Sequence, residues 1–154
     1  MRRITRSLLT GAGLALALAG GAGAQEPVGS AMSLPVPDAE RGKDLFVNKG
    51  CVVCHSVNGV GGRAAPPLDA TEPAGVFDPL DFAARIWRGA EAMIALQDME
   101  FGYRIELTGR EIADLAAFSE NHAVQATFTE ADIPETIRDW TLDAPLDPSA
   151  MEAE

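Results

Sequence analysis

The sequence predicts an all-α domain in which helices alternate with long loops. Capping residues precede several apolar stretches, and apolar residues recur at spacings of three and four. No stretch alternates between apolar and polar residues as a half-buried strand does. The length of 154 residues fits one domain, and a hydrophobic content of 47% is enough for one core.

The first 24 residues have the pattern of a secretory signal peptide. Three arginines precede an apolar stretch from about Leu8 to Ala19, and Ala22-Gly23-Ala24 resembles a cleavage site. Because the apolar stretch is interrupted by glycines and is short for a bilayer span of about 20 residues, we expect cleavage rather than a retained membrane anchor. Residues 25–37, which contain three prolines, are predicted to form a flexible N-terminal segment.

The first predicted helix covers residues 39–49. Asp38 has the position of an N-cap, Leu45 and Phe46 supply the apolar face, and Gly50 ends the helix. Residues 56–75 are rich in glycine and proline and contain few apolar side chains, so we expect a long irregular loop there.

The next helix is predicted to begin at Asp78, which is followed by a proline in the favoured first position. Its apolar face is a single stripe at spacings of four, three and four, formed by Phe82, Ile86, Gly89 and Met93. A turn is expected around residues 101–103.

The last helix of the predicted domain begins with a capping box. Thr108 and Glu111 have the required spacing, and the apolar pattern continues to about Asn121, with His122 at the helix end. Residues 123–154 are predicted to form an acidic C-terminal extension. It contains one short helix that starts near Pro134 and docks through Ile133, Ile137 and Trp140.

One motif carries chemistry: Cys51-Val52-Val53-Cys54-His55. The C-x-x-C-H spacing is typical of covalent haem attachment, in which two thioethers form with the haem vinyl groups and the histidine lies beneath the iron. It therefore predicts one haem c, attached through Cys51 and Cys54, with His55 as an axial ligand.

Three other interpretations of the motif are weaker. A thioredoxin-like dithiol requires a βαβ context that this sequence lacks. A zinc site needs four ligands, and outside the motif the sequence has no further cysteine and only one further histidine, His122. A disulfide between Cys51 and Cys54 closes too small a loop to stabilise the chain much.

From about Asp38 to His122 the sequence resembles the class I, single-haem c-type cytochromes. Gly42 and Phe46 resemble the glycine and aromatic residue of that family's first helix, and Leu115 and Phe118 resemble a pair on its last helix. The resemblance implies a small helical domain wrapped around the haem, in which these two helices cross closely at the glycine.

The segment Ala65-Pro66-Pro67-Leu68 resembles the family's G-P-x-L segment, with alanine in place of glycine. The resemblance implies that the Pro66 carbonyl accepts a hydrogen bond from Nδ1 of His55. Such a bond fixes the ring and raises its basicity as a ligand.

The resemblance also implies a methionine as the sixth iron ligand, supplied between the middle and last helices. Met93 and Met99 are the candidates, and we predict Met93. The stretch from Trp87 to Met93 resembles a bacterial subgroup in which a tryptophan precedes the ligand by six residues. Trp87 itself is expected to be either a core aromatic residue or a hydrogen-bond donor to a haem propionate.

A haem iron with both axial positions filled by protein is suited to one-electron transfer. We therefore expect a soluble periplasmic electron carrier with no enzymatic activity of its own. One alternative is a haem-bearing subunit of a periplasmic dehydrogenase or oxidase. Another is a ligand-binding or peroxidatic haem protein with an open distal site.

The negative charge of the chain indicates which kinds of partner it can bind. A net charge of −11 argues against binding to nucleic acid or to anionic membranes. Residues 120–154 hold nine acidic side chains against Arg138 alone, and the chain has only two lysines, Lys43 and Lys49. We therefore predict a redox partner with a basic docking face.

Overall fold

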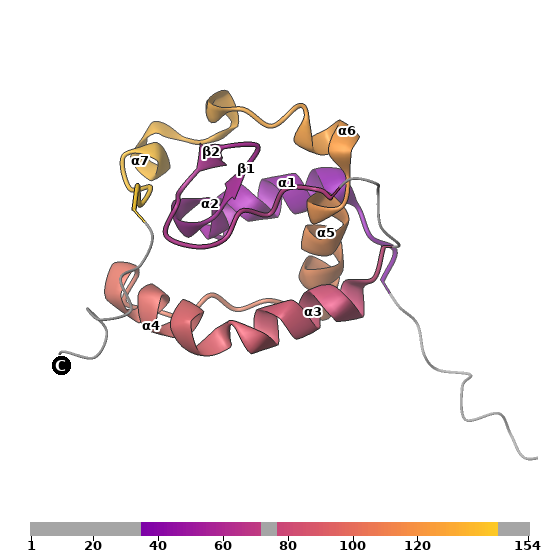
Figure 1. The fold of residues 1–154 in the computed structure, drawn as a ribbon, viewed down its shortest axis with the longest axis horizontal. Helices are drawn as coiled ribbons and strands as arrows, with labels where there is room; N and C mark the ends of the chain where they lie inside the picture. Colours follow the sequence, from indigo (N-terminus) through magenta and orange to yellow (C-terminus); the bar gives the residue numbers. More distant parts are fainter. Residues whose placement is uncertain (1–34, 72–76, 145–154) are drawn as a thin grey trace, which may run out of the picture. The chain divides into compact units, whose positions relative to one another are not determined.

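The computed structural model describes residues 35–71 and 77–144. Within these ranges the chain is mostly helical, with two short strands, which confirms the all-α class (Figure 1). The elements are α1 (Ala39–Asn48), α2 (Cys51–Cys54), β1 (Ser56–Val57), β2 (Val60–Gly61), α3 (Pro79–Arg88), α4 (Ala90–Glu100), α5 (Gly109–Ser119), α6 (His122–Gln125), the 3-10 turn η1 (Glu130–Asp132) and α7 (Glu135–Arg138). The predicted signal peptide, residues 1–24, and most of the segment predicted over 25–37 lie outside the described residues. None of the helices in the described ranges has the length and apolar character needed to cross a bilayer.

Helix α1 begins and ends where the sequence predicts. The Asp38 carboxylate accepts hydrogen bonds from the backbone N–H groups of Glu40 and Arg41 at 3.0 and 3.1 Å. These bonds satisfy donors that a helix start leaves without partners. Gly50 follows the helix with φ of 79°, a left-handed conformation that glycine adopts without a steric penalty.

Helix α1 crosses α5 at Gly42. A Cβ atom on Gly42 would overlap the backbone carbonyl of Asp114 and would lie 2.8 Å from Cβ of Phe118. The two helix backbones therefore touch at this point, and only glycine fits there. The close crossing that the family resemblance implies is thus confirmed.

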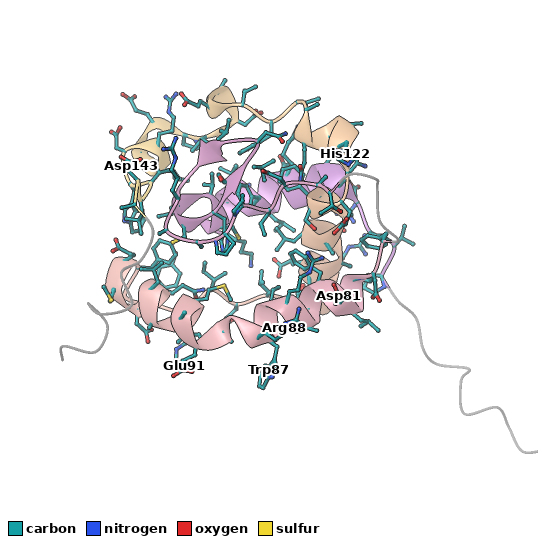
Figure 2. The ribbon with its side chains drawn as sticks, in the orientation of Figure 1. Asp81, Trp87, Arg88, Glu91, His122 and Asp143 are labelled. Atoms are coloured by element: carbon teal, nitrogen blue, oxygen red, sulfur yellow. The ribbon has the colours of Figure 1, made fainter. Side chains whose placement is uncertain are left out.

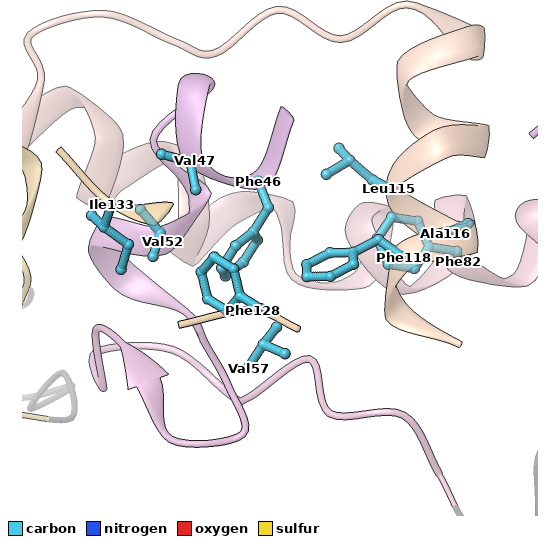
Figure 3. Packing of buried hydrophobic residues seen from close by; sticks show 10 residues of the cluster. All are labelled: Phe46, Val47, Val52, Val57, Phe82, Leu115, Ala116, Phe118, Phe128 and Ile133. Carbon is cyan, nitrogen blue, oxygen red and sulfur yellow. The ribbon is translucent and has the colours of Figure 1, made fainter. Parts of the chain in front are cut away.

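Three phenylalanine rings form the centre of the core (Figure 3). Phe46 lies 5.7 Å from Phe118 and 5.6 Å from Phe128, and the latter two rings are 5.9 Å apart. All three are at most 4% exposed. Because these rings come from α1, α5 and the chain beyond α6, one core joins the first and the last described parts of the fold.

The predicted stripe over residues 82–93 is divided between two helices. Helix α3 begins as predicted, with Asp78 capping the N–H groups of Leu80 and Asp81. However, the helix ends at Arg88, and Gly89 separates it from α4. Because glycine is a weak helix former, it allows the chain to change direction here.

The loop predicted over residues 56–75 contains a short hairpin that the sequence analysis missed. Strands β1 and β2 are antiparallel, with Ser56 opposite Gly61 and Val57 opposite Val60. The turn is Asn58-Gly59, and both residues have positive φ, at 51° and 80°. Asn-Gly is the favoured pair for a two-residue hairpin turn with this geometry, so the signal was present in the sequence.

Beyond α5 the described chain continues through α6, η1 and α7. The expectation that His122 ends the preceding helix is wrong, because α5 stops at Ser119 and Asn121 caps α6, in which His122 is the first residue. The Asn121 side chain accepts from the backbone N–H of Val124 at 3.0 Å. An Asn side chain competes well for free backbone donors, which favours a new start over continuation.

The short helix predicted in the C-terminal extension is present as α7, after Pro134. Ile133 is buried and Ile137 is half-buried against the core, as predicted, whereas Trp140 is 41% exposed and contacts Phe101 edge-on at 4.9 Å. The backbone of Leu142 then pairs with α2 and the following loop, accepting from the N–H of Arg63 and donating to the carbonyl of Val53. Residues 123–144 therefore pack on the same core as the preceding helices.

Candidate functional site

The C-x-x-C-H motif forms the single turn α2 and the residue after it. Cys51 and Cys54 are three residues apart on this turn, so they share a face. Val52 and Val53, which lie between them, are fully buried and fix the turn to the core. His55 follows in extended conformation, with φ of −104° and ψ of 151°, which takes the chain out of the helix.

The imidazole of His55 is held by the backbone. Its Nδ1 lies 2.7 Å from the carbonyl oxygen of Pro66, as the family resemblance implies. Since a carbonyl only accepts, Nδ1 carries the proton and donates it, which leaves the lone pair on Nε2. Burial lowers the pKa of His55, and the bond to Pro66 opposes this only in part. The ring is therefore neutral at pH 7, the form in which histidine ligates metals.

The Pro66 segment is positioned by its own backbone bonds. The N–H of Ala65 donates to the carbonyl of Cys54, and the N–H of Leu68 donates to the carbonyl of Ser56, both at 2.9 Å. Among the described residues other than glycine, Asn58 alone has a positive φ. Alanine therefore replaces the family's glycine at position 65 without backbone strain.

Neither cysteine is in a disulfide. Burial raises the pKa of Cys51 to about 12 and that of Cys54 to about 11. A dithiol redox centre needs a thiol whose pKa is lowered, so this environment does not favour the thioredoxin-like interpretation.

The described residues do not form a zinc site either. In the described ranges no group of three or more histidine, cysteine and acidic side chains could hold a metal ion. His122, the remaining candidate ligand, has its Nε2 3.0 Å from the carbonyl oxygen of Thr71.

The two methionines considered as the sixth ligand have different environments. Met93 is half-buried in the first half of α4, whereas Met99, near the end of the same helix, is 64% exposed. A ligand must reach the interior of the fold, so the burial favours Met93. The Phe82–Ile86 part of the stripe on α3 is likewise the inward face, with Phe82 buried and Ile86 half-buried.

The expectation that Trp87 is a core aromatic residue is wrong. Its side chain is 81% exposed and points away from the fold (Figure 2). Trp87 lies on the outward face of α3, because the inward positions are taken by the stripe. Because the indole points outward, its direction does not favour the other predicted role of Trp87, a hydrogen bond to a haem propionate.

Comparison with protein families identifies the chain. The family described as Cytochrome c matches residues 39–122, which is more than half of the sequence. The protein belongs to the cytochrome c family. No curated protein and no solved structure matches the chain.

Members of the cytochrome c family bind haem c covalently through cysteines and transfer electrons. The site fits this cofactor, since α2 presents two unbridged thiols on one face and His55 follows with Nδ1 already hydrogen-bonded. Haem c is therefore the cofactor of this cytochrome, with Cys51 and Cys54 as its attachment residues.

The family match ends at His122, but buried polar contacts continue beyond it. Gln125 is 1% exposed and hydrogen-bonds to the loop that follows Pro66. Gln125 is not among the candidate residues that the sequence indicates. A glutamine in a polar segment carries no pattern that indicates burial, so no signal in the sequence could have identified it.

Proposed function

We propose that this cytochrome is a soluble, periplasmic, one-electron carrier of the class I, single-haem type, with His55 and Met93 as axial ligands. The bond between His55 Nδ1 and the Pro66 carbonyl is the observation that supports it most. It provides a neutral imidazole of fixed orientation, which is what a permanent axial ligand requires. The half-buried position of Met93 supports a second protein ligand.

The chain's own residues would perform two tasks. Cys51 and Cys54 hold the cofactor on α2, so retention does not depend on a large enclosing pocket. His55 and Met93 would ligate the haem iron and would thereby keep oxygen and peroxide from binding to it. Haem c, when bound, supplies an iron that changes by one electron with little rearrangement of its ligands.

The proposed partner is a redox protein with a basic docking face. Residues 123–144, the described C-terminal part of the chain, contain one arginine, Arg138, and several exposed carboxylates. The exposed carboxylates are those of Glu130, Asp132, Glu135, Asp139 and Asp143. Opposite charges steer two proteins together, and salt screens this steering. A neutralised variant in which Glu130 and Glu135 become glutamine should associate more slowly at low salt and equally fast at high salt. Association rates that do not change with ionic strength would contradict the steering.

Purification of the native protein from periplasmic extract tests the carrier function. A carrier should elute alone, be reduced and reoxidised reversibly, and lack the signal residues 1–24. Elution in fixed stoichiometry with a larger catalytic protein would instead indicate the haem-bearing subunit of a dehydrogenase or oxidase. A high-spin, five-coordinate spectrum would indicate the open distal site.

A further inference from the structure

Gln125, the last residue of α6, places a fully hydrogen-bonded amide inside the fold. Its Oε1 accepts from the backbone N–H of Ala70 at 2.9 Å. Its Nε2 donates to the carbonyl of Leu68 at 2.8 Å and to the carbonyl of Phe118 at 3.0 Å. Both amide hydrogens are thus used, and the side chain is 1% exposed.

These bonds connect α5 and α6 to the segment that carries Pro66. On one side, the N–H of Ala65 donates to Cys54 of the attachment motif, and the N–H of Leu68 donates to Ser56, the residue that follows the motif. On the other side, the carbonyl of Leu68 and the N–H of Ala70 are bonded to Gln125. The carbonyl that orients His55 therefore belongs to a short segment that is held from both sides.

The turn of the β1–β2 hairpin reinforces this connection. Asn58 donates from Nδ2 to the backbone carbonyl of Gln125 at 3.2 Å, and its N–H donates to the Asp69 carboxylate at 2.6 Å. The α6 end, the hairpin and residues 68–70 therefore form one hydrogen-bonded unit. Gln125 is the most deeply buried polar side chain of this unit, at 1% exposed.

We propose that Gln125 is a positioning residue for the axial histidine: it holds residues 66–70 so that the Pro66 carbonyl stays on Nδ1 of His55. This role rests on the proposed function, in which His55 ligates the iron. Gln125 lies beyond residues 39–122, so the proposed positioning residue belongs to a part of the chain that the family match does not include.

Loss of the amide should loosen the His55–Pro66 bond. Gln125→Met keeps the length of the side chain but removes the partner of the Leu68 carbonyl and of the Ala70 N–H. The Phe118 carbonyl loses one donor and keeps its bond from the N–H of Asn121. The freed groups of Leu68 and Ala70 then turn to water, and the segment that carries Pro66 is no longer held on the side of α6. A weaker bond at Nδ1 makes the imidazole a poorer electron donor, which disfavours ferric iron.

The experiment uses the haem-loaded protein and two readouts, solvent exchange of the His55 Nδ1 proton by NMR and the midpoint potential. In Gln125→Met we expect the His55 Nδ1 proton to exchange roughly ten times faster or more, since its hydrogen bond to the Pro66 carbonyl is weakened. We expect the midpoint potential to rise. If this variant yields no holoprotein, Gln125→Glu replaces it, because it keeps the oxygen that faces Ala70 and changes the Nε2 donor. The same two shifts are expected.

Phe128→Leu is the matched control. Phe128 is buried to a similar degree as Gln125 and belongs to the same part of the chain, but its side chain packs on the rings of Phe46 and Phe118 and has no group that could hydrogen-bond to residues 66–70. The Phe128→Leu variant should lower the thermal midpoint and leave exchange and potential near the wild-type values. Unchanged exchange and potential in the Gln125 variant, or equal changes in Phe128→Leu, would overturn the proposal.

Different results would contradict the axial role of His55 and the positioning role of Gln125. If the His55 ring signals of the wild-type protein show no shift from the haem, the axial role of His55 is wrong, whatever Gln125 does. If those signals are strongly shifted in the wild type and the Gln125 variants behave like it, only the role of Gln125 is wrong.

Discussion

The crossing of α1 and α5 gives a stability prediction of defined size. In Gly42→Ala the new Cβ would lie 2.7 Å from the carbonyl carbon of Asp114 and 2.8 Å from Cβ of Phe118. Both neighbours are parts of a rigid helix, so no side-chain rotation relieves the contact. The helices must separate by about 1 Å to reach ordinary carbon–carbon contact.

This separation loosens the contact between Phe46 and Phe118, which lie at the centre of the core. Overpacking in a core costs about 1 to 3 kcal/mol, and the better helix propensity of alanine recovers about 1 kcal/mol. Because the clash involves backbone atoms, we expect the upper end of that cost, about 3 kcal/mol. The net loss is then about 2 kcal/mol, which corresponds to roughly 7 °C in the thermal midpoint.

Denaturant unfolding of the holoprotein, followed by circular dichroism, measures this loss. Gly109→Ala is the matched control, because Gly109 is also on a helix, its φ is not positive, and no atom lies within 4 Å of its added Cβ. The control should change the free energy of unfolding by less than about 0.5 kcal/mol. Equal stabilities of the two variants would refute the close-crossing argument.

Three further predictions concern a cap, an exposed aromatic residue and the sixth ligand. Lys49 and the Thr108 backbone lower the pKa of Glu111 to about 2, so Glu111→Gln should be less stable than wild type at pH 7. The difference in the free energy of unfolding between the variant and the wild type should shrink as the pH falls from about 4.3, the ordinary pKa of a glutamate, toward 2. A difference that does not change with pH would contradict this prediction. Trp87→Ala should change the free energy of unfolding by less than about 0.5 kcal/mol, because the indole is 81% exposed; a loss of several kcal/mol would show that it packs inside the fold. Met93→Ala should lower the midpoint potential and abolish the methionine-to-ferric-iron charge-transfer band, whereas Met99→Ala should leave both nearly unchanged, and the reverse result would transfer the role to Met99.

Helix starts could be predicted because their signals are local. Asp38, Asp78 and Thr108 each cap backbone groups two or three residues away, and the structure has all three caps. The contact between His55 and Pro66 was also anticipated, although the residues are 11 apart, because the segment resembles that of a known family.

Other features depend on packing between distant parts of the chain. The side on which Trp87 lies is decided by which face of α3 meets the core, and Gln125 is buried only because residues 68–70 and 118 surround it. The hairpin at Asn58-Gly59 is different, since its turn signal was visible but its strands are only two residues long. Such short strands contain too few residues to show an alternating pattern.

The pair of axial ligands is the central claim, and NMR of the reduced protein labelled with ¹³C at the methionine methyl groups tests it most directly. A methionine bound to the iron lies against the haem face, so its methyl signal moves far from the usual range. We expect one such signal, which persists in Met99→Ala and disappears in Met93→Ala. A wild-type spectrum in which every methionine methyl signal lies in the usual range would contradict methionine ligation and with it the proposed electron-transfer site.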